Sequence, residues 1–321
     1  MPGCEGRARF MSDLRFDGRV AVVTGGGRGI GLAYCRLLAA RGARVVLNDL
    51  GVAMEGGGSD AGLAAEAAES IRRDGGAAEA DVSDISTGDG ARELIAHALH
   101  SFGSVDIVVS NAGIFWTERF PEVPREALDR QLAVHVGGAF EVSRAAWPHM
   151  AAAGYGRVVM TTSSGALGSP NLTSYGTAKA AVLGLTRSLA MSGRDAGIRV
   201  NAVAPMAMTR MMAAGMKGTP ADEPADERDP GLVAPLVALL CHDRCPVTGE
   251  AFNAGMRRFS RFVIAESEGY LHSGADVSPE DVLSHWDEVM DPSRLRIVTD
   301  TFDWAEAHFG LLRSRGTIIA P

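Results

Sequence analysis

The amino-acid sequence predicts an α/β protein built on a doubly wound parallel sheet. Short β-branched runs alternate with longer helical patterns, and the runs are apolar at nearly every position, as in strands buried on both faces. Such alternation is typical of parallel strands joined by crossover helices. The expected strands are "RVAVVTG" (19–25), "ARVVLNDL" (43–50), a short strand ending at Asp81, "VDIVVSNAG" (105–113), "GRVVMTTS" (156–163) and "IRVNAVAP" (198–205).

The segments between these strands have the spacing of apolar residues expected of helices. "GLAYCRLLAARG" (31–42) follows the first strand and "AAEAAESIRRDG" (64–75) follows the second. A long helical stretch precedes the strand at 156, and "YGTAKAAVLGLTRSLAMSG" (175–193) comes after it. Each segment is long enough to return the chain to the start of the next parallel strand.

Composition excludes several classes of protein. The chain has 321 residues, a formal charge of −8 and no apolar run that approaches the roughly 20 residues of a membrane span. No basic stripe is present, so nucleic acid is not expected as a partner. Without a long apolar run a membrane is not expected either, and we expect a small-molecule substrate. Four cysteines without a secretory signal favour free thiols in a reducing cytoplasm. Cys241 and Cys245 lack a second ligand pair, so no metal site is expected.

A glycine-rich turn, "TGGGRGIG" (24–31), follows the first strand and opens a helix. Glycines let the chain turn tightly and let backbone N–H groups approach a diphosphate at the positive end of the helix. The next strand ends at Asp49, eighteen residues after Gly31, where a carboxylate would accept the ribose hydroxyls of a dinucleotide. A 2′-phosphate would meet like charge there, so NAD is favoured over NADP. The expected loop contacts are Gly25, Arg28, Gly29, Ile30 and Gly31.

Two later strand ends are further candidates for cofactor contacts. Asp81, or the backbone of Val82, could meet the adenine edge, although an Asp before a helix is equally a capping residue. "SNAG" (110–113) ends the fourth strand with small residues that let the backbone lie against a ring or a ribose. We therefore include Asn111, Ala112 and Gly113 among the expected cofactor contacts.

Tyr175 and Lys179 form a candidate proton-transfer pair. Four residues apart on a helix, they share one face, so an ammonium group lies near the phenol and favours its ionised form. A phenol with a pKa near 10 becomes a usable acid or base only with such help. Tyr175 would exchange the proton that accompanies hydride transfer, and Lys179 would also bind the nicotinamide ribose. A hydroxyl from "TTSS" (161–164) would hold the carbonyl oxygen.

These motifs, with "RVNAVAP" (199–205), resemble the short-chain dehydrogenase/reductase family over roughly residues 16–255. The resemblance implies a Rossmann-type subunit, assembly as a homodimer or homotetramer, and a catalytic Ser, Tyr and Lys with an assisting Asn. Counting back from Tyr175 selects Thr162 as the family serine, whereas counting from the strand start selects Ser163. We prefer Ser163, because strand register fixes the direction of a side chain and a loop absorbs a deletion.

A narrower resemblance concerns the substrate. "VVLNDLG", "HVGGAFEVSRAAWPHM", "APLVALLCHDRC" and "VSPEDVLSHWDEVMD" are similar to the (3R)-hydroxyacyl-CoA dehydrogenase unit of peroxisomal multifunctional enzymes and their bacterial relatives. The likeness includes His135, which stands where most family members carry the Asn that supports a proton-relay water. A neutral His could serve there through a ring nitrogen, or it could simply pack in the helix.

Three functions remain open. The first is an NAD-dependent dehydrogenase of (3R)-hydroxyacyl-CoA, and the second is a dehydrogenase of a steroid or polyketide hydroxyl. The third is a catalytically silent NAD-binding protein, motivated by the altered serine spacing and by His135. The Met-rich segment "MAMTRMMAAGMKG" (206–218) could line the substrate pocket. Arg210, Arg257 and Arg258 could meet CoA phosphates, although solvated surface charges are the more common case.

The chain is expected to form a flexible leader (1–15), an NAD-binding catalytic domain (16–257) and a helical C-terminal extension (258–321). Met11 could be the true start of the protein. Within the extension, Ser278 and Pro279 are typical of a helix start. The extension is too small for a core of its own, so its aromatic residues should pack on the body or on a partner subunit.

Overall fold

The structure of the protein is a computed structural model, which describes residues 14–207, 209 and 225–314. The chain divides into two compact units, Met1–Arg261 and Phe262–Pro321. Nearly all of the expected leader lies outside the described residues. Among the helices of the described part, none is both long enough and apolar enough to cross a membrane.

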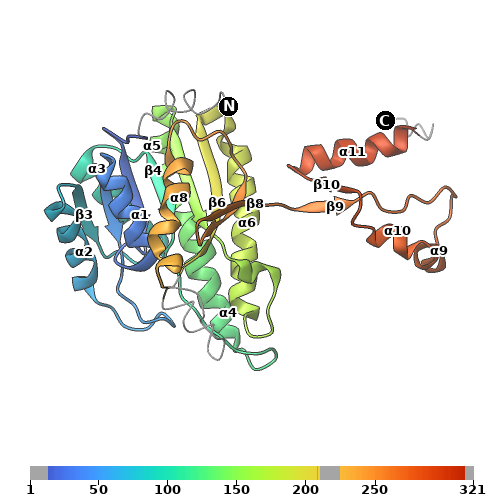
Figure 1. The fold of residues 1–321 in the computed structure, drawn as a ribbon, viewed down its shortest axis with the longest axis horizontal. Helices are drawn as coiled ribbons and strands as arrows, with labels where there is room; N and C mark the ends of the chain where they lie inside the picture. The colour runs from blue at the N-terminus through green and yellow to red at the C-terminus, as the bar shows by residue number, and fades with distance from the viewer. Residues whose placement is uncertain (1–13, 208, 210–224, 315–321) are drawn as a thin grey trace, which may run out of the picture. The chain divides into compact units, whose positions relative to one another are not determined.

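The first unit contains an eight-stranded sheet in the order β3-β2-β1-β4-β5-β6-β7-β8 (Figure 1). The pairs from β3 to β7 are parallel, so the predicted doubly wound α/β fold is confirmed. Met256 and Arg257, both with positive φ, form the two-residue turn of a hairpin between β7 and β8. The strands are β1 (Val20–Thr24), β2 (Arg44–Asn48), β3 (Ala77–Asp81), β4 (Ile107–Ser110), β5 (Gly156–Thr161), β6 (Ile198–Met206), β7 (Ala251–Gly255) and β8 (Arg258–Phe262).

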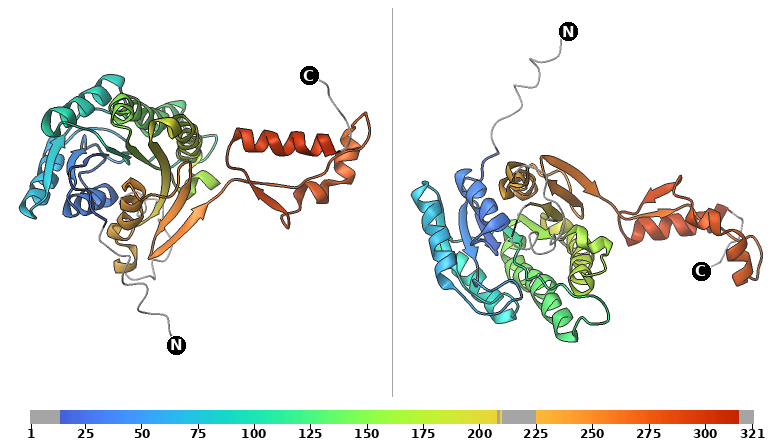
Figure 2. Two further views of the ribbon diagram at one scale, coloured as in Figure 1. Left: turned by 90° about the horizontal axis from the view of Figure 1, so that it is seen from above. Right: turned by 60° about the horizontal axis from the view of Figure 1, so that its bottom comes forward.

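Helices cover both faces of this sheet (Figure 2). On one face α1 contacts α2 and α8, and on the other α3 contacts α5 while α6 packs on β5 and β6. The helices are α1 (Gly29–Ala40), α2 (Ala61–Arg73), α3 (Gly88–Phe102), α4 (Arg125–Leu132), α5 (Ala139–Ala153), α6 (Thr173–Gly193) and α8 (Ala234–Cys241). Short helical turns are η2 (Ala133–Gly138), η3 (Ser164–Leu167), η4 (Arg194–Ala196), η5 (Ala225–Arg228) and η6 (Pro230–Leu232).

The core explains why the central strands are apolar throughout. Every residue of β1 and β4 is buried, because each strand lies between two layers of helices. The core between the sheet and the layer of α1, α2 and α8 takes residues from both sides. The helices contribute Leu38, Ile71 and Val237, and the strands contribute Leu47 and Val109. Burial of this continuous apolar surface is the main stabilising contribution to the unit.

The strand order places the loops that follow β1 and β4 side by side. The chain passes outward from β1 to β3 and then returns to β4 on the other side of β1. In a parallel sheet this reversal opens a crevice at the carboxyl ends of the strands, where ligands bind. Thr24 ends β1 opposite both Asn48 and Ser110, so the three following loops start at the same edge.

The second unit contains α9 (Pro279–Ser284), α10 (Trp286–Met290) and α11 (Thr301–Ser314) and an antiparallel strand pair, β9 (Ala265–Ser267) and β10 (Leu295–Ile297). The predicted helix start is confirmed, because Ser278 and Asp281 form a reciprocal capping box at α9. The strand pair was not predicted, since three residues are too few to show a period of two. Trp286, Trp304 and Phe309 are 50%, 43% and 58% exposed, so this unit does not enclose its own aromatic residues.

Candidate active site

A pocket of about 830 Å³ lies at the carboxyl edge of the sheet. It begins at the turn after β1 and reaches η3 and the first turns of α6. Its lining includes Gly25, Arg28, Gly29, Ile30, Gly31, Asn48, Asp49, Val52, Gly56, Ser83, Asp84, Ile85, Ser86, Asn111, Ala112, Gly113, Ile114, Phe115, Arg130, Val134, His135, Thr161, Ser163, Leu172, Tyr175, Lys179, Pro205, Ala207 and Thr209.

The glycine loop is shaped by positions that have no room for a side chain. A Cβ on Gly31 would lie 2.0 Å from the Gly25 carbonyl oxygen, so this position must be glycine. Gly25 has a φ of +66°, in the left-handed region, and a Cβ there would lie 2.8 Å from the Ala112 Cα. Within the part of the chain that the structure describes, no side chain caps the amino end of α1, which opens into the pocket. This cradle of backbone N–H groups fits a dinucleotide diphosphate.

Asp49 lies at the end of β2, behind the glycine loop. Its carboxylate is 8% exposed and accepts hydrogen bonds from the backbone N–H of Gly27, at 3.0 Å, and of Gly51, at 2.9 Å. These bonds fix the carboxylate at the pocket wall, next to the loop. Arg28 donates to the Val52 carbonyl at 2.6 Å, so the loop is also tied to the segment after β2.

The structure does not bring Asp81 and Val82 into the lining of the pocket. The Asp81 carboxylate accepts from Asn48 Nδ2 at 2.8 Å and from the Ser83 N–H at 2.9 Å, and it lies 3.0 Å from His97 Nδ1. It therefore joins β2, β3 and α3 to one another. The residues that line the pocket at this strand end are instead 83–86, which the sequence prediction missed.

The segment after β4 is held against the glycine loop. Asn111 Nδ2 donates to the carbonyl groups of Thr24 and Gly25, both at 3.2 Å. The Ala112 N–H donates to Thr24 Oγ1 at 3.0 Å. A Cβ on Gly113 would lie 2.4 Å from His135 Cε1, so Gly113 makes room for that ring. The three residues thus form a wall of backbone between the loop and α6.

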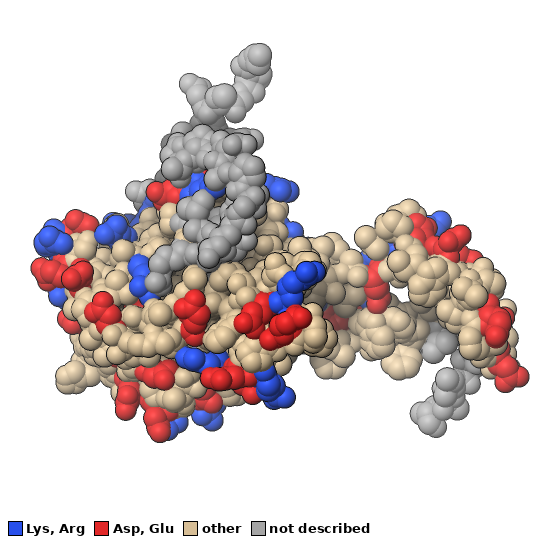
Figure 3. Space-filling view, turned by 90° about the horizontal axis from the view of Figure 1, so that it is seen from below, with Lys and Arg blue, Asp and Glu red and all other residues tan. Residues whose placement is uncertain are grey.

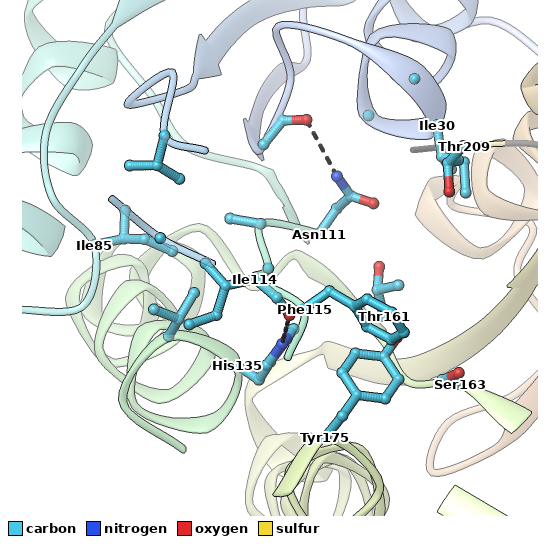
Figure 4. A pocket seen from close by; sticks show the side chains of 18 of the residues that line it. Ile30, Ile85, Asn111, Ile114, Phe115, His135, Thr161, Ser163, Tyr175 and Thr209 are labelled. Carbon is cyan, nitrogen blue, oxygen red and sulfur yellow. Dashed lines mark hydrogen bonds between the residues drawn. The ribbon is translucent and has the colours of Figure 1, made fainter. Parts of the chain in front are cut away.

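Tyr175 lies at the other end of the pocket and is 9% exposed. Its ring is contacted edge-on by Phe115, with centroids 4.9 Å apart, and by His135, with centroids 5.5 Å apart (Figure 4). Burial raises the pKa of Tyr175 above its usual value, while the Ser163 hydroxyl opposes this shift by hydrogen bonding. We expected Lys179 to lower this pKa; the net shift is upward, because desolvation of the phenolate is the larger effect.

Lys179 is buried on the next turn of α6. Its Nζ donates to the Thr161 carbonyl at 2.7 Å and lies 5.6 Å from the centre of the Tyr175 ring. Burial lowers the pKa of Lys179 from 10.5 to about 7, because the ammonium has lost most of its hydration. The pair predicted from the sequence is therefore together in space, with both members desolvated.

The two candidate hydroxyls after β5 point to different places. Thr162 is also among the residues that line the pocket, but it is 2% exposed, and its Oγ1 donates to the Lys179 carbonyl at 2.7 Å, inside the packing of α6. Ser163 also lines the pocket, and its hydroxyl lowers the pKa of Tyr175 against the larger effect of burial. It also accepts from the Gly165 N–H at 3.1 Å, which orients it.

His135 occupies η2, a π-helical turn between α4 and α5. Its Nε2 lies 2.8 Å from the Ile114 carbonyl, so Nε2 carries the proton and donates to that oxygen. Burial, reinforced by the charge of Lys179, lowers the pKa of His135 well below its usual value. The ring is therefore neutral, and its Nδ1 is a buried acceptor with no partner among the described residues.

Comparison with known proteins identifies the chain. A sequence model described as short chain dehydrogenase matches residues 19–219. A short-chain type dehydrogenase/reductase of Mycobacterium tuberculosis is 40% identical over 87% of this chain and 96% of its own length. The chain belongs to the short-chain dehydrogenase family. It is therefore an oxidoreductase that acts on CH–OH groups of small molecules with a nicotinamide dinucleotide.

Within this family the chain is similar to larger enzymes. Peroxisomal multifunctional enzyme type 2 of Mus musculus is 38% identical over 87% of this chain, which spans 38% of that protein's length. The full-length structure of the Drosophila melanogaster enzyme of the same name matches 94% of this chain and 50% of its own, with a TM-score of 0.75 and 28% identity. The predicted resemblance, both to the family and to multifunctional enzymes, is confirmed.

Several pocket residues of this dehydrogenase were not predicted. Phe115 and Leu172 form apolar wall near Tyr175, and Arg130 lines the wall that α4 contributes. Gln131, fully buried, lies 3.1 Å from His135 Nε2. Its place four residues before His135 on a helix was the one signal that could have found it.

Residues 208 and 210–218 of the Met-rich segment, including Arg210, lie outside the described residues. Arg257 pairs with Glu227 at 3.2 Å.

Proposed function

We propose that this protein is an NAD-dependent dehydrogenase that interconverts a secondary alcohol and a ketone, with Tyr175 as the general acid/base. The observation that carries the proposal is the convergence of Tyr175, Lys179 and Ser163 at one end of a pocket whose other end is the glycine loop. The roles of these residues follow from their distances, burial and charge.

In the oxidation direction, Tyr175 takes the proton from the substrate hydroxyl. Ser163 donates its hydrogen bond to the substrate oxygen and holds it next to the phenol. Lys179 stabilises the phenolate that exists during the transfer, because an ammonium near a phenolate favours the charged form. When NAD is bound, its nicotinamide ring supplies the hydride acceptor. The edges of Phe115 and His135 keep the Tyr175 ring in place for this transfer.

His135 is proposed to pass the proton onward. Its neutral ring lines the pocket, and no described residue bonds to its Nδ1 acceptor. Its pKa is lowered by burial and, to a smaller degree, by the nearby Lys179. A water between Nδ1 and the Lys179 ammonium would satisfy both groups, since buried polar atoms rarely remain without partners. Such a water would accept a proton from Lys179, and Lys179 would regain one from the phenol of Tyr175 that the substrate has protonated, so the phenolate would be restored.

NAD rather than NADP is proposed as the cofactor. Asp49 would accept the hydroxyls of the adenosine ribose, and its negative charge opposes a 2′-phosphate at the same place. The backbone bonds from Gly27 and Gly51 hold the carboxylate in place for this discrimination. The proposed cofactor contacts at this end are Gly25, Arg28, Gly29, Ile30, Gly31, Asn111, Ala112 and Gly113, with Asp81 and Val82 in supporting positions outside the lining.

A (3R)-hydroxyacyl-CoA is proposed as the substrate, giving the 3-ketoacyl-CoA. Support comes from the similarity to multifunctional enzymes over 87% of the chain and from His135, which belongs to that resemblance. The apolar wall of Phe115, Leu172 and Ala207 suits an acyl chain, and it also suits a steroid or polyketide alcohol. We further propose a cytoplasmic homodimer or homotetramer in which residues 258–321 pack on the body or on a partner subunit.

The test is turnover of NAD with each enantiomer of a series of 3-hydroxyacyl-CoA esters, followed by the absorbance of reduced nicotinamide. Wild type should oxidise the R series alone, and Tyr175→Phe should lower kcat/KM by about 10²- to 10⁴-fold, the contribution of a positioned acid/base. The phenol hydroxyl is the one group removed, so binding of NAD should persist in the variant.

Two other outcomes would change the proposal. Turnover of steroid or polyketide alcohols with no turnover of any thioester would transfer the assignment to the alternative substrates. NAD binding without turnover of any alcohol would contradict a catalytic role and leave a silent dinucleotide-binding protein.

A further inference from the structure

The segment that follows β2 forms part of the pocket wall. Residues 51–58, called the strap here, run from the end of β2 toward α2, and Val52, Ala53 and Gly56 line the pocket. The strap is bonded within itself, since the Ala53 N–H donates to the Gly57 carbonyl at 2.7 Å and the Gly56 N–H to Ala53 at 3.0 Å. It is thus a small folded unit at the cofactor end of the pocket.

Three separate elements fasten the strap to the rest of the pocket. Arg28 of the glycine loop donates to the Val52 carbonyl at 2.6 Å, and the Phe115 N–H donates to the Met54 carbonyl at 2.8 Å. Arg130, on α4, donates through Nη2 to the Gly56 carbonyl at 2.8 Å. Arg28, Phe115 and Arg130 all line the pocket and belong to three different segments of the chain, so the strap is fastened to three separate parts of the pocket wall.

The Gly56 end of the strap fits closely against its neighbours. Gly56 has a φ of +89°, in the region that favours glycine. A Cβ there would lie 3.0 Å from Arg130 Nη2 and 3.1 Å from Ile114 Cγ2. Gly58 also has a positive φ, +73°, but a Cβ there would meet nothing within 4 Å. The strap therefore has one packed glycine and one open glycine, two residues apart.

Arg130 does not behave like the other arginine of its helix. Arg125 is 81% exposed at its side chain and pairs with Asp129 on the same helix. Arg130 instead reaches a backbone carbonyl 74 residues away in sequence. A guanidinium that bonds across a pocket holds two segments together, whereas an exposed pair within one helix contributes little.

We propose that Arg130 is a positioning residue for the dinucleotide, which it retains by holding the strap across the cofactor end of the pocket. This inference rests on the proposed NAD-binding function. Asp49 and the strap both line this end of the pocket, so with the strap fastened they would hold the adenosine side of a bound dinucleotide. Loss of the Arg130 bond frees the Gly56 end, and the cofactor then dissociates faster.

The test compares Arg130→Gln with Arg125→Gln and Gly56→Ala with Gly58→Ala in the full-length protein. The dissociation constant for NAD, from titration calorimetry, should rise about tenfold in Arg130→Gln, the effect of one charged hydrogen bond. Gly56→Ala should weaken NAD binding in the same direction, and both controls should match wild type. KM for NAD should rise by more than kcat falls. Hydrogen exchange of peptides covering 51–58 should become faster in Arg130→Gln.

The outcomes separate this inference from the proposed function. If wild type binds NAD and Arg130→Gln binds it equally well, with unchanged exchange in 51–58, the strap has no role in cofactor retention. If Arg125→Gln and Gly58→Ala lose as much affinity for NAD as Arg130→Gln and Gly56→Ala, the effect is not specific to the Gly56 end. The inference is then also wrong. If wild type binds no dinucleotide, the proposed function itself fails, and this inference fails with it.

Discussion

The two ends of the pocket are built from different parts of the chain. At the cofactor end, the geometry comes from backbone: glycines without room for a Cβ, carbonyl groups that bind Asn111, and N–H groups that bind Asp49. At the proton-transfer end, it comes from the buried side chains of Tyr175, Lys179 and His135. The first end is therefore sensitive to volume, and the second to charge and hydration. Substitutions that add a side-chain atom at a glycine should weaken cofactor binding at the first end. Substitutions that remove a titratable group should impair proton transfer at the second end.

The largest effect on the cofactor end should come from Gly31→Ala. Its Cβ would lie 2.0 Å from the Gly25 carbonyl oxygen, so the glycine loop has to move. NAD affinity should fall about a hundredfold, and the free energy of unfolding should fall by about 1–3 kcal/mol, as in other overpacked sites. Calorimetric titration and urea unfolding measure the two effects.

A matched control is Gly184→Ala on α6, where a Cβ would meet nothing within 4 Å. There the substitution should raise stability by up to about 1 kcal/mol, because alanine favours a helix. Equal NAD affinity in Gly31→Ala and wild type would contradict the view that the loop is limited by volume.

A smaller effect at the same end tests charge rather than volume. Asp49→Asn keeps the shape of the side chain, but its single amide oxygen can accept from only one of the two N–H groups, of Gly27 and Gly51, that bind the carboxylate. The ratio of kcat/KM for NAD to that for NADP should fall about tenfold, since one like charge no longer opposes a 2′-phosphate. Steady-state kinetics with both cofactors measure the ratio. Asp60→Asn, at the amino end of α2, keeps its capping role and should leave the ratio unchanged.

At the proton-transfer end, Lys179 gives the protein a dependence of stability on pH. Its pKa is about 7 when folded and near 10.5 when unfolded, so the unfolded chain binds more protons between these values. The free energy of unfolding should therefore rise with pH from about 7 to about 10.5 and level off outside this window, where the folded and unfolded states bind the same number of protons at Lys179. Relative to Lys179→Met, wild type should gain on the order of 2 kcal/mol between pH 7 and 9. The free energy of unfolding is measured with urea at each pH. If it changes with pH by the same amount in wild type and in Lys179→Met, Lys179 is not desolvated.

The sequence predicted most of the cofactor end because its signals are local. The glycines, Asp49 and Asn111 each follow an apolar strand, and parallel strands bring their carboxyl ends to one edge. Asp81 also follows a strand, but its carboxylate accepts hydrogen bonds from Asn48 and Ser83 instead of lining the pocket. The position of a residue at a strand end does not reveal such bonds. The choice between Thr162 and Ser163 depended on register. In the structure Thr162 Oγ1 donates to the Lys179 carbonyl of α6, whereas the Ser163 hydroxyl lowers the pKa of Tyr175.

Contacts between distant segments were beyond local patterns. Nothing near Arg130 in the sequence indicates that it bonds to Gly56, because the two residues meet only once the fold has brought α4 to the loop after β2. The upward pKa shift of Tyr175 was missed for a related reason. Helical spacing shows that Lys179 is near, but the degree of burial, which decides the direction, depends on Phe115 and other residues from elsewhere in the fold.

The close fit between Gly113 and His135 has a consequence for how this enzyme can diverge. The imidazole ring fills the space that any Cβ at position 113 would need, with 2.4 Å between that atom and Cε1. The two positions are therefore epistatic: a side chain at 113 can be accepted only after residue 135 has become smaller. Divergence at this site has a fixed order, in which the residue on η2 changes first and the glycine after β4 second.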